Sequence, residues 1–218
     1  MAVAEREHAA VEVVDLATTS LRDLNRRLHE LAETPGPSHW RIVNPSGAHA
    51  VACGLDADVE VEIDGHVGYY CAGMNKLATV RVHGNASQSA AATGRGGLVV
   101  VYGDASARCG ISMKGVDIVV RGSVGHLSAF MAQTGRLVVC GDAGDALGDS
   151  LYEAVIYIRG QVKSLGADAR EEPMTGTDHD AVKNLLAKAG LKHDPGEFRR
   201  VASKRELYHW NADANQEY

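Results

Sequence analysis

The chain has 218 residues, of which 45% are hydrophobic and only 5% are Phe, Trp or Tyr, and its formal net charge is −6. This length suffices for one domain with a buried core and appendages, and the acidic balance argues against a nucleic-acid-binding protein. No apolar run reaches ~18 residues and residues 1–10 do not resemble a signal peptide, so we expect a cytoplasmic protein with no membrane span.

Residues 1–54 are predicted to form an N-terminal cap built from a strand and a helix. Residues 11–16 alternate weakly, as a strand does, and Thr18, Thr19 and Ser20 offer N-caps to the helix. One stripe of that helix is leucine, at Leu21, Leu24, Leu28 and Leu31. Pro35, Gly36 and Pro37 end it. Residues 40–54 look irregular, with Ile42 and Gly47 as an imperfect first coil of the repeat that follows.

Residues 55–166 contain a repeat with a period of 19 residues. Glycine recurs at this interval at Gly65, Gly84, Gly103, Gly122, Gly141 and Gly160. The positions four and two residues before each glycine, and two residues after it, are apolar in all six copies. A fixed period near 20 residues indicates a stacked array in which each unit buries its apolar face on its neighbours.

The repeat unit has the pattern of a β-strand followed by tight corners. Apolar residues before each glycine alternate with more variable ones, and many are β-branched. Seven residues after each glycine a second small residue occurs, at Ala72, Ala91, Gly110, Ala129, Gly148 and Ala167. We therefore predict an all-β solenoid, a single-stranded β-helix with 19-residue coils stacked ~4.8 Å apart and roughly 25–30 Å long in all. The repeat does not determine its handedness.

Residues 167–218 are predicted to form a C-terminal helical tail. A polar loop is expected at residues 166–176, and Asp178 is expected to start a helix that Gly190 ends. A second helix start is predicted at Asp194, followed by a basic tract at Arg199, Arg200, Lys204 and Arg205. We interpret this tract either as a solvated helix face or as a contact for an acidic partner.

No catalytic or metal-binding constellation is found in the sequence. Cys53, Cys71, Cys109 and Cys140 form no CxxC pair and are predicted to be reduced, mostly buried thiols. The ten histidines do not share a repeat position. The glycines of residues 94–97 and 141–144 are explained by the repeat, because no strand–GxGxxG–helix unit surrounds them.

Two rows of equivalent positions carry more information. Lys76, Arg95 and Lys114 each lie eleven residues after a glycine and should stack ~5 Å apart, which disfavours like charges unless solvent or an anion screens them. They are candidate partner contacts, although a solvated corner is the simpler interpretation. Three residues before each of the last four glycines lies an outward row of apolar residues, Val100, Val119, Val138 and Tyr157. Such a row should not face water, so either a terminal helix of this chain or another subunit should cover it, and we favour a helix of this chain.

The sequence resembles the GXGXG-repeat family. Residues 93–105 (TGRGGLVVVYGDA) and 113–122 (MKGVDIVVRG) are similar to the repeats of the C-terminal right-handed β-helix of the glutamate synthase large subunit. Free-standing members are the small GXGXG subunit of N-methylglutamate synthase-type complexes and a scaffold subunit of formylmethanofuran dehydrogenase. The resemblance extends over residues 11–210. It weakens where Gln133, Thr134 and Gly135 replace the basic residue and glycine of the earlier copies.

The resemblance implies a non-catalytic role for this chain. In glutamate synthase the β-helix carries no catalytic residue, and it packs against a glutaminase domain and a barrel domain with FMN and an iron–sulfur cluster. The resemblance therefore implies a scaffold subunit without cofactors, whose partners are a glutamine amidotransferase-like subunit and an FMN-binding synthase-like subunit.

Three other functions of β-solenoid proteins make different demands on the sequence or on its partners. A formylmethanofuran dehydrogenase-type scaffold would have molybdenum or tungsten subunits as partners. A β-helical acyltransferase would need hexapeptide repeats, which the 19-residue period does not provide. A self-assembling solenoid is disfavoured because terminal helices would block the coil edges.

Overall fold

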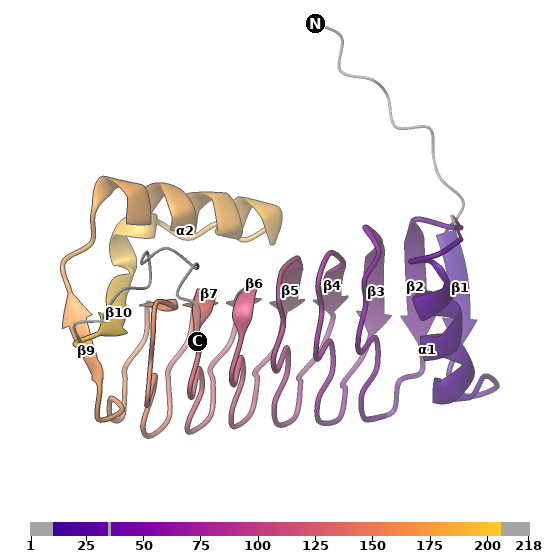
Figure 1. Cartoon of the computed structure of the whole chain (residues 1–218), viewed down its shortest axis with the longest axis horizontal. Helices are drawn as coiled ribbons and strands as arrows, with labels where there is room; N and C mark the ends of the chain where they lie inside the picture. Colours follow the sequence, from indigo (N-terminus) through magenta and orange to yellow (C-terminus); the bar gives the residue numbers. More distant parts are fainter. Residues whose placement is uncertain (1–10, 35, 206–218) are drawn as a thin grey trace, which may run out of the picture.

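The structure is a computed structural model that describes residues 11–34 and 36–205 (Figure 1). Residues 1–10, to which the signal-peptide prediction refers, and residues 206–218 of the predicted C-terminal tail lie outside this range. The strands are β1 (Val11–Asp15), β2 (His39–Val43), β3 (Glu60–Asp64), β4 (Thr79–Val82), β5 (Leu98–Val101), β6 (Lys114–Val120), β7 (Thr134–Val139), β8 (Val155–Ile158), β9 (Ala169–Glu172) and β10 (Arg199–Ser203). The helices are α1 (Leu21–Glu30), α2 (Gly176–Lys188) and the 3₁₀ turn η1 (Pro195–Glu197).

One sheet of ten strands runs along the molecule in the order β1-β2-β3-β4-β5-β6-β7-β8-β10-β9 (Figure 1). Strands β1 to β8 are parallel, and from β3 to β8 Val61, Val80, Val99, Ile118, Leu137 and Ile156 lie in register. A second line of parallel bridges joins Val67, Ala86, Ala105, Val124, Ala143 and Val162. The chain is therefore a β-solenoid of about six turns with 19-residue coils, as the repeat predicts.

The inside of the solenoid is filled with apolar side chains from end to end. The rows before and after the repeat glycines, which the sequence places inside, lie in one core cluster with side chains of α1. Ile63, Ile118 and Leu137 are fully buried in it. These β-branched and small residues fit a narrow interior, which explains why so few aromatic residues are needed.

Each coil returns through an arch with left-handed residues at alternate positions. In the coil of Gly65 these are Tyr70, Ala72 and Met74, with φ of 63°, 52° and 58°. The middle position of each arch is the second small position that the sequence singled out, and it has positive φ in five copies, Ala72, Ala91, Gly110, Ala129 and Gly148. The prediction of a tight corner there is thus confirmed. The middle position is small because it is buried inside the solenoid, as Ala72 and Ala91 are, whereas Tyr70 and Met74 have the same positive φ with larger side chains.

The N-terminal segment is more regular than predicted. The structure has β2 within the segment expected to be irregular, and Ile42 pairs in register with Ile63 of β3. The parallel sheet therefore starts at β1, well before residue 55. Helix α1 starts after the N-cap Ser20 and lies at this end of the solenoid (Figure 1). Its buried residues Leu24 and Leu28 join the core cluster.

The C-terminal segment contains two strands that the sequence analysis missed. The predicted loop at residues 166–176 includes β9, and Arg199 and Arg200 of the basic tract lie on β10 instead of a helix, with Lys204 and Arg205 directly after the strand. Strand β10 pairs antiparallel with both β8 and β9. The prediction failed because these strands do not continue the 19-residue repeat. Helix α2 begins at Gly176 after the N-cap Thr175, two residues before the predicted start, and Asp178 is its third residue and forms a capping box with Thr175.

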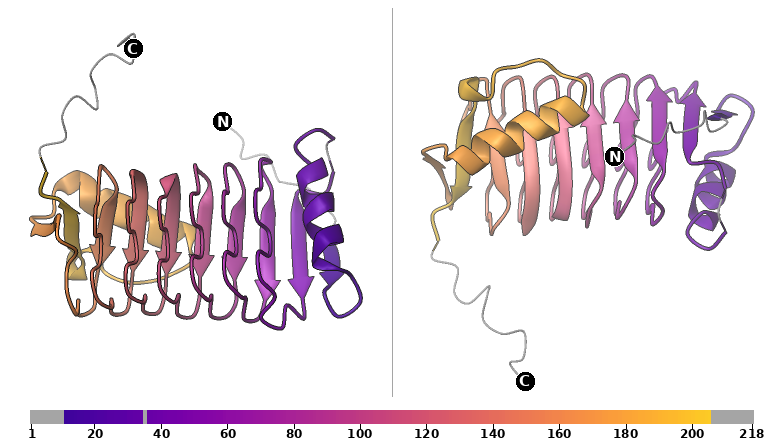
Figure 2. Two further views of the ribbon diagram at one scale, coloured as in Figure 1. Left: turned by 60° about the horizontal axis from the view of Figure 1, so that its bottom comes forward. Right: turned by 90° about the horizontal axis from the view of Figure 1, so that it is seen from above.

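Helix α2 lies along the outer face of the sheet, seen from above in the right view of Figure 2. Val182, Leu185, Leu186 and Ala189 pack there with Phe198 and the outward row Val100, Val119, Val138 and Tyr157. The prediction that a helix of this chain covers that row is confirmed. Thirteen helical residues span ~20 Å, about the width of the four strands that bear the row. Among the described residues, no helix has the length and apolar character needed to cross a membrane.

Candidate interaction surface

Lys76, Arg95 and Lys114 lie side by side on one edge of the solenoid. The backbone amide of Arg95 donates to the carbonyl of Asn75 at 2.7 Å, and that of Lys114 donates to Gly94 at 2.7 Å, so the three residues occupy successive coils. All three side chains are exposed. We call these three residues the basic ridge, and the structure thus brings together three of the five predicted contact residues.

The charges of the basic ridge are only partly balanced. Lys76 forms an ion pair with Asp56 of the preceding coil. In residues 11–34 and 36–205, no carboxylate lies within 4.0 Å of the charged group of Arg95 or Lys114. Two cations ~5 Å apart in water repel one another by ~0.8 kcal/mol, so a carboxylate placed between them would be stabilised.

The other two predicted contact residues lie elsewhere and are occupied within the chain. Arg199 pairs with Glu171 and Arg200 with Glu172, across the β10–β9 ladder. Arg200 also contacts Asp178 at 3.3 Å and is only 21% exposed. These two arginines therefore hold the C-terminal end of the sheet together and do not extend the basic ridge.

The repeat glycines are required mainly by close approach of neighbouring coils. A Cβ on Gly103 would lie 2.7 Å from the carbonyl oxygen of Gly84, and one on Gly122 would lie 2.7 Å from that of Gly103. The amides of Gly103 and Gly122 donate to those same carbonyls at 2.9 and 3.0 Å. Of the six glycines predicted to be structural, only Gly65 has a positive φ, of 139°. The remaining copies show that contact between backbones is the decisive constraint.

A ladder of polar side chains follows the glycines and was missed by the sequence analysis. The residue after each glycine is His66, Asn85, Asp104, Ser123, Asp142 or Gln161. The side chains of the first five each accept a hydrogen bond of 2.7–2.9 Å from the backbone amide 19 residues later. The available signal was that every copy carries a hydrogen-bond acceptor there, although the residue types differ.

A buried polar network fastens α2 to the sheet. The Tyr157 hydroxyl donates to Asp178 at 2.7 Å, and the Asp178 carboxylate also accepts from the backbone amide and hydroxyl of Thr175. Burial opposes ionisation of Asp178, but these hydrogen bonds outweigh it and hold its pKa below the ordinary value. Burial and the bond to the carboxylate raise the pKa of Tyr157 far above its ordinary value. The tyrosine therefore remains a donor at any physiological pH.

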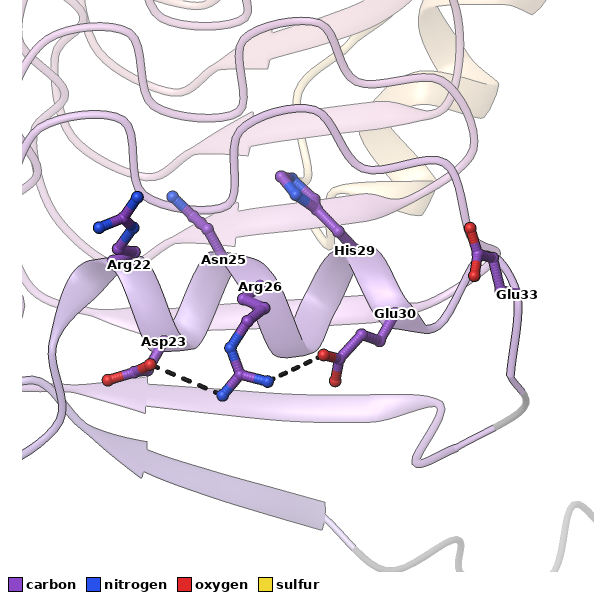
Figure 3. Close-up of a pocket in the computed structure, with 7 residues that line it drawn as sticks. All are labelled: Arg22, Asp23, Asn25, Arg26, His29, Glu30 and Glu33. Carbon is purple, nitrogen blue, oxygen red and sulfur yellow. Dashed lines mark hydrogen bonds and ion pairs between the residues drawn. The ribbon is translucent and has the colours of Figure 1, made fainter.

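Helix α1 supplies hydrogen bonds that a preceding coil would otherwise make. Asn25 donates to the carbonyl of Ala50 and accepts from the amide of Ala52, at 2.9 and 3.1 Å. The ring of His29 lies 2.7 Å from the carbonyl oxygen of Cys53. Figure 3 shows both side chains pointing toward the first coil. They satisfy backbone groups that are paired with a neighbouring coil elsewhere in the solenoid.

The depression around α1 is a feature of the helix surface. It has a volume of about 720 Å³, is open to solvent, and is lined by Arg22, Asp23, Asn25, Arg26, His29, Glu30 and Glu33 (Figure 3). Arg26 bridges Asp23 and Glu30 on its outer side, at 3.6 and 2.8 Å. The polar groups that line the depression thus pair with one another along α1. Such pairing is common on helix surfaces and does not by itself indicate a catalytic site.

The thiols do not have the environment of reactive cysteines. All four cysteines are free, and Cys71, Cys109 and Cys140 are buried. Burial raises the pKa of Cys71 and Cys109 to about 12 and that of Cys140 to about 11. Such thiols are protonated near neutral pH and are poor nucleophiles. Within the described part of the chain, no group of three or more His, Cys, Asp or Glu residues is arranged to hold a metal ion.

Comparison with known proteins adds one relative. Protein GlxC of Rhizobium meliloti (strain 1021) is 52% identical to the chain over 226 residues, which covers 94% of this chain and 99% of that protein. No protein-family profile and no solved structure matches the chain. The similarity extends across almost the whole of both proteins. The chain therefore belongs to the same family as protein GlxC.

Proposed function

We propose that the chain is a non-catalytic scaffold subunit of a multi-subunit glutamate synthase-like or N-methylglutamate synthase-like enzyme. The partners would be a glutamine amidotransferase-like subunit and an FMN-binding subunit that also holds an iron–sulfur cluster. We further propose that the β-helix is right-handed, that α1 and the C-terminal segment cover its ends, and that the complex is cytoplasmic. The hand comes from the resemblance of the repeats to the glutamate synthase β-helix, and the covered ends from the need of a solenoid to protect its terminal coils. The location comes from the sequence, in which no signal peptide or membrane span is recognised.

The observation that carries the proposal is the uniform construction of the solenoid. Its six glycines, its inward apolar rows and its polar ladder recur every 19 residues, and its interior is filled by side chains such as Ile118 and Leu137. A rod of this kind offers its outer surface to other proteins. A scaffold function uses that outer surface. The buried, protonated thiols are poor nucleophiles, which agrees with a role that needs no reactive cysteine.

The test is purification of the tagged chain from its native cells, followed by mass spectrometry and an absorbance spectrum of the eluate. We expect stoichiometric amidotransferase-like and flavoprotein subunits and a flavin spectrum. Partners containing molybdenum or tungsten would instead support the formylmethanofuran dehydrogenase-type scaffold. A colourless chain eluting alone at several salt concentrations would contradict both assignments.

A further inference from the structure

We propose that the basic ridge, together with the exposed side chains of Met74, Leu77 and Met131, is the docking surface for an acidic face of a partner subunit. This inference rests on the proposed function, because it requires that catalytic partner subunits exist. It adds the position of the contact on the solenoid and the chemistry of the surface that it recognises.

The first argument is that four cations elsewhere on the solenoid pair with a carboxylate on an adjacent coil, whereas Arg95 and Lys114, like Arg108 and Arg121, form no ion pair with a described residue. The pairs that show this are Arg41–Asp64, Arg81–Glu60, Arg136–Asp117 and Lys163–Asp145, with N–O distances of 2.6 to 2.7 Å. In contrast, Lys114 is flanked by Arg95 on one side and by Thr134 on the other. Arg95 and Lys114 are therefore two cations on neighbouring coils that share no carboxylate with the described chain.

The second argument is the apolar surface that adjoins the ridge. Met74 and Leu77 are 47% and 54% exposed and lie beside Lys76 in the chain. Met131 is 42% exposed and has the same repeat position as Met74, in the coil that follows Lys114. Methionine and arginine are enriched in protein interfaces, and exposed apolar residues beside charged ones are typical of contact surfaces.

The third argument is the bare backbone next to the ridge. Gly96 and Gly115 directly follow Arg95 and Lys114, in the row that Leu77 begins. A Cβ on either glycine would lie 2.5 Å from the carbonyl oxygen of the ridge residue one coil earlier. No side chain can therefore stand there, and a partner can approach the backbone closely while its carboxylates reach Arg95 and Lys114.

An acidic protein surface fits this edge better than a nucleic acid does. The ridge has three cations, one already paired with Asp56, and the whole chain carries a net charge of −6. Binding to a phosphate backbone usually depends on a more extensive basic surface. The exposed apolar side chains beside the ridge fit the mixed composition of a protein interface.

The experiment is chemical cross-linking of the complex that is purified with the tagged chain. A zero-length carbodiimide reagent forms an amide only between a lysine and a carboxylate in direct contact. We expect Lys114 or Lys76 to be joined to an Asp or Glu of an identified amidotransferase-like or flavoprotein subunit. Lys183 and Lys192, which are exposed on and after α2, are the controls and should not be joined.

A pair of charge-matched variants tests the energetic contribution. Arg95→Glu with Lys114→Glu should reduce the retained partner ~10-fold at ~0.15 M salt, as loss of interfacial charge pairs does. Lys183→Glu with Lys192→Glu changes the net charge by the same amount and should leave retention unchanged. A urea unfolding curve of each variant shows that the fold is intact.

The outcomes separate this inference from the proposed function. If the partners remain bound to the ridge variant as well as to the control, the docking surface is elsewhere, and the scaffold function stands. A lysine of the ridge joined only to residues 206–218 of the same chain, or a partner lost on nuclease treatment, also overturns the inference. A wild-type chain that retains neither catalytic subunit overturns both.

Discussion

The hydroxyl of Tyr157 on β8 donates a hydrogen bond of 2.7 Å to Oδ1 of Asp178 in the first turn of α2. Tyr157 is the last member of the outward apolar row, and its neighbours in that row contact the apolar face of α2. The bond therefore fixes where the helix begins along the sheet. Arg200 of β10 contacts the same carboxylate, so the carboxylate joins three elements that are distant in sequence.

Replacing Tyr157 by Phe should lower the free energy of unfolding by about 1–3 kcal/mol. The change leaves the packing of the ring in place but removes a donor from a buried, ionised carboxylate. Urea unfolding followed by circular dichroism measures the effect. The control is Tyr152→Phe, since no hydrogen bond from that hydroxyl to another described residue is present. Equal stability of the two variants would show that the bond contributes nothing.

Replacing Asp178 by Asn should make the stability difference from the wild type depend on pH. The pKa of Asp178 is lowered in the folded protein, so its ionisation contributes stability above the unfolded pKa of ~3.9. That contribution is lost as the pH falls through the lower, folded pKa. We expect the wild type to be the more stable at pH 6–7, and the difference to shrink below pH ~4. A difference that stays constant from pH 7 to pH 3 would contradict this.

Replacing Gly122 by Ala should destabilise the solenoid by about 1–3 kcal/mol. The new Cβ would lie 2.7 Å from the carbonyl oxygen of Gly103, so adjacent coils would have to move apart. Gly176→Ala is the matched control, because a Cβ there meets no atom within 4 Å at the start of α2. That variant should be neutral or slightly stabilised. Thermal unfolding of both proteins decides whether close approach matters as the structure indicates.

Replacing Asp104 by Ala should accelerate amide hydrogen exchange at Ser123. The Asp104 carboxylate accepts from this amide at 2.8 Å, and alanine has no acceptor. Asp104→Asn keeps an acceptor and should preserve most of the protection. Ser106→Ala, an exposed change in the same coil, serves as the control for indirect effects. Similar exchange in the Ala and Asn variants would contradict the role of the side-chain ladder.

Alkylation of the folded protein at pH 8 should distinguish the cysteines. Burial raises the pKa of Cys71 and Cys109 to about 12, so almost none of either thiol is ionised at that pH. Burial also raises the pKa of Cys53, but this residue is only half-buried and should be labelled first. Iodoacetamide labelling followed by peptide mass spectrometry tests the order. Rapid labelling of Cys109 without unfolding would contradict the burial seen in the structure.

The repeat allowed much of the fold to be predicted, because equivalent residues occupy equivalent positions in successive coils. The inward rows, the second small position and the need for a helix over Val100, Val119, Val138 and Tyr157 were all expected from the pattern, and the structure confirms them. The basic ridge was predicted for the same reason, since Lys76, Arg95 and Lys114 share one position. The polar ladder was harder to recognise in the sequence. His66, Asn85 and Ser123 each have a side-chain atom that accepts a hydrogen bond, but they are different residue types.

The sequence by itself determined what recurs every 19 residues: the solenoid, its buried faces and the stacking of the three cations. The tertiary structure alone decided what lies outside the repeat. Residues 199–203 became strand β10 because they pair with the edge of β8, and residues 169–172 became β9 because they pair with β10. The same pairing brings Arg199 to Glu171 and Arg200 to Glu172. A periodic pattern reports similar surroundings along one chain, whereas contacts between unlike segments depend on which segments come together in space.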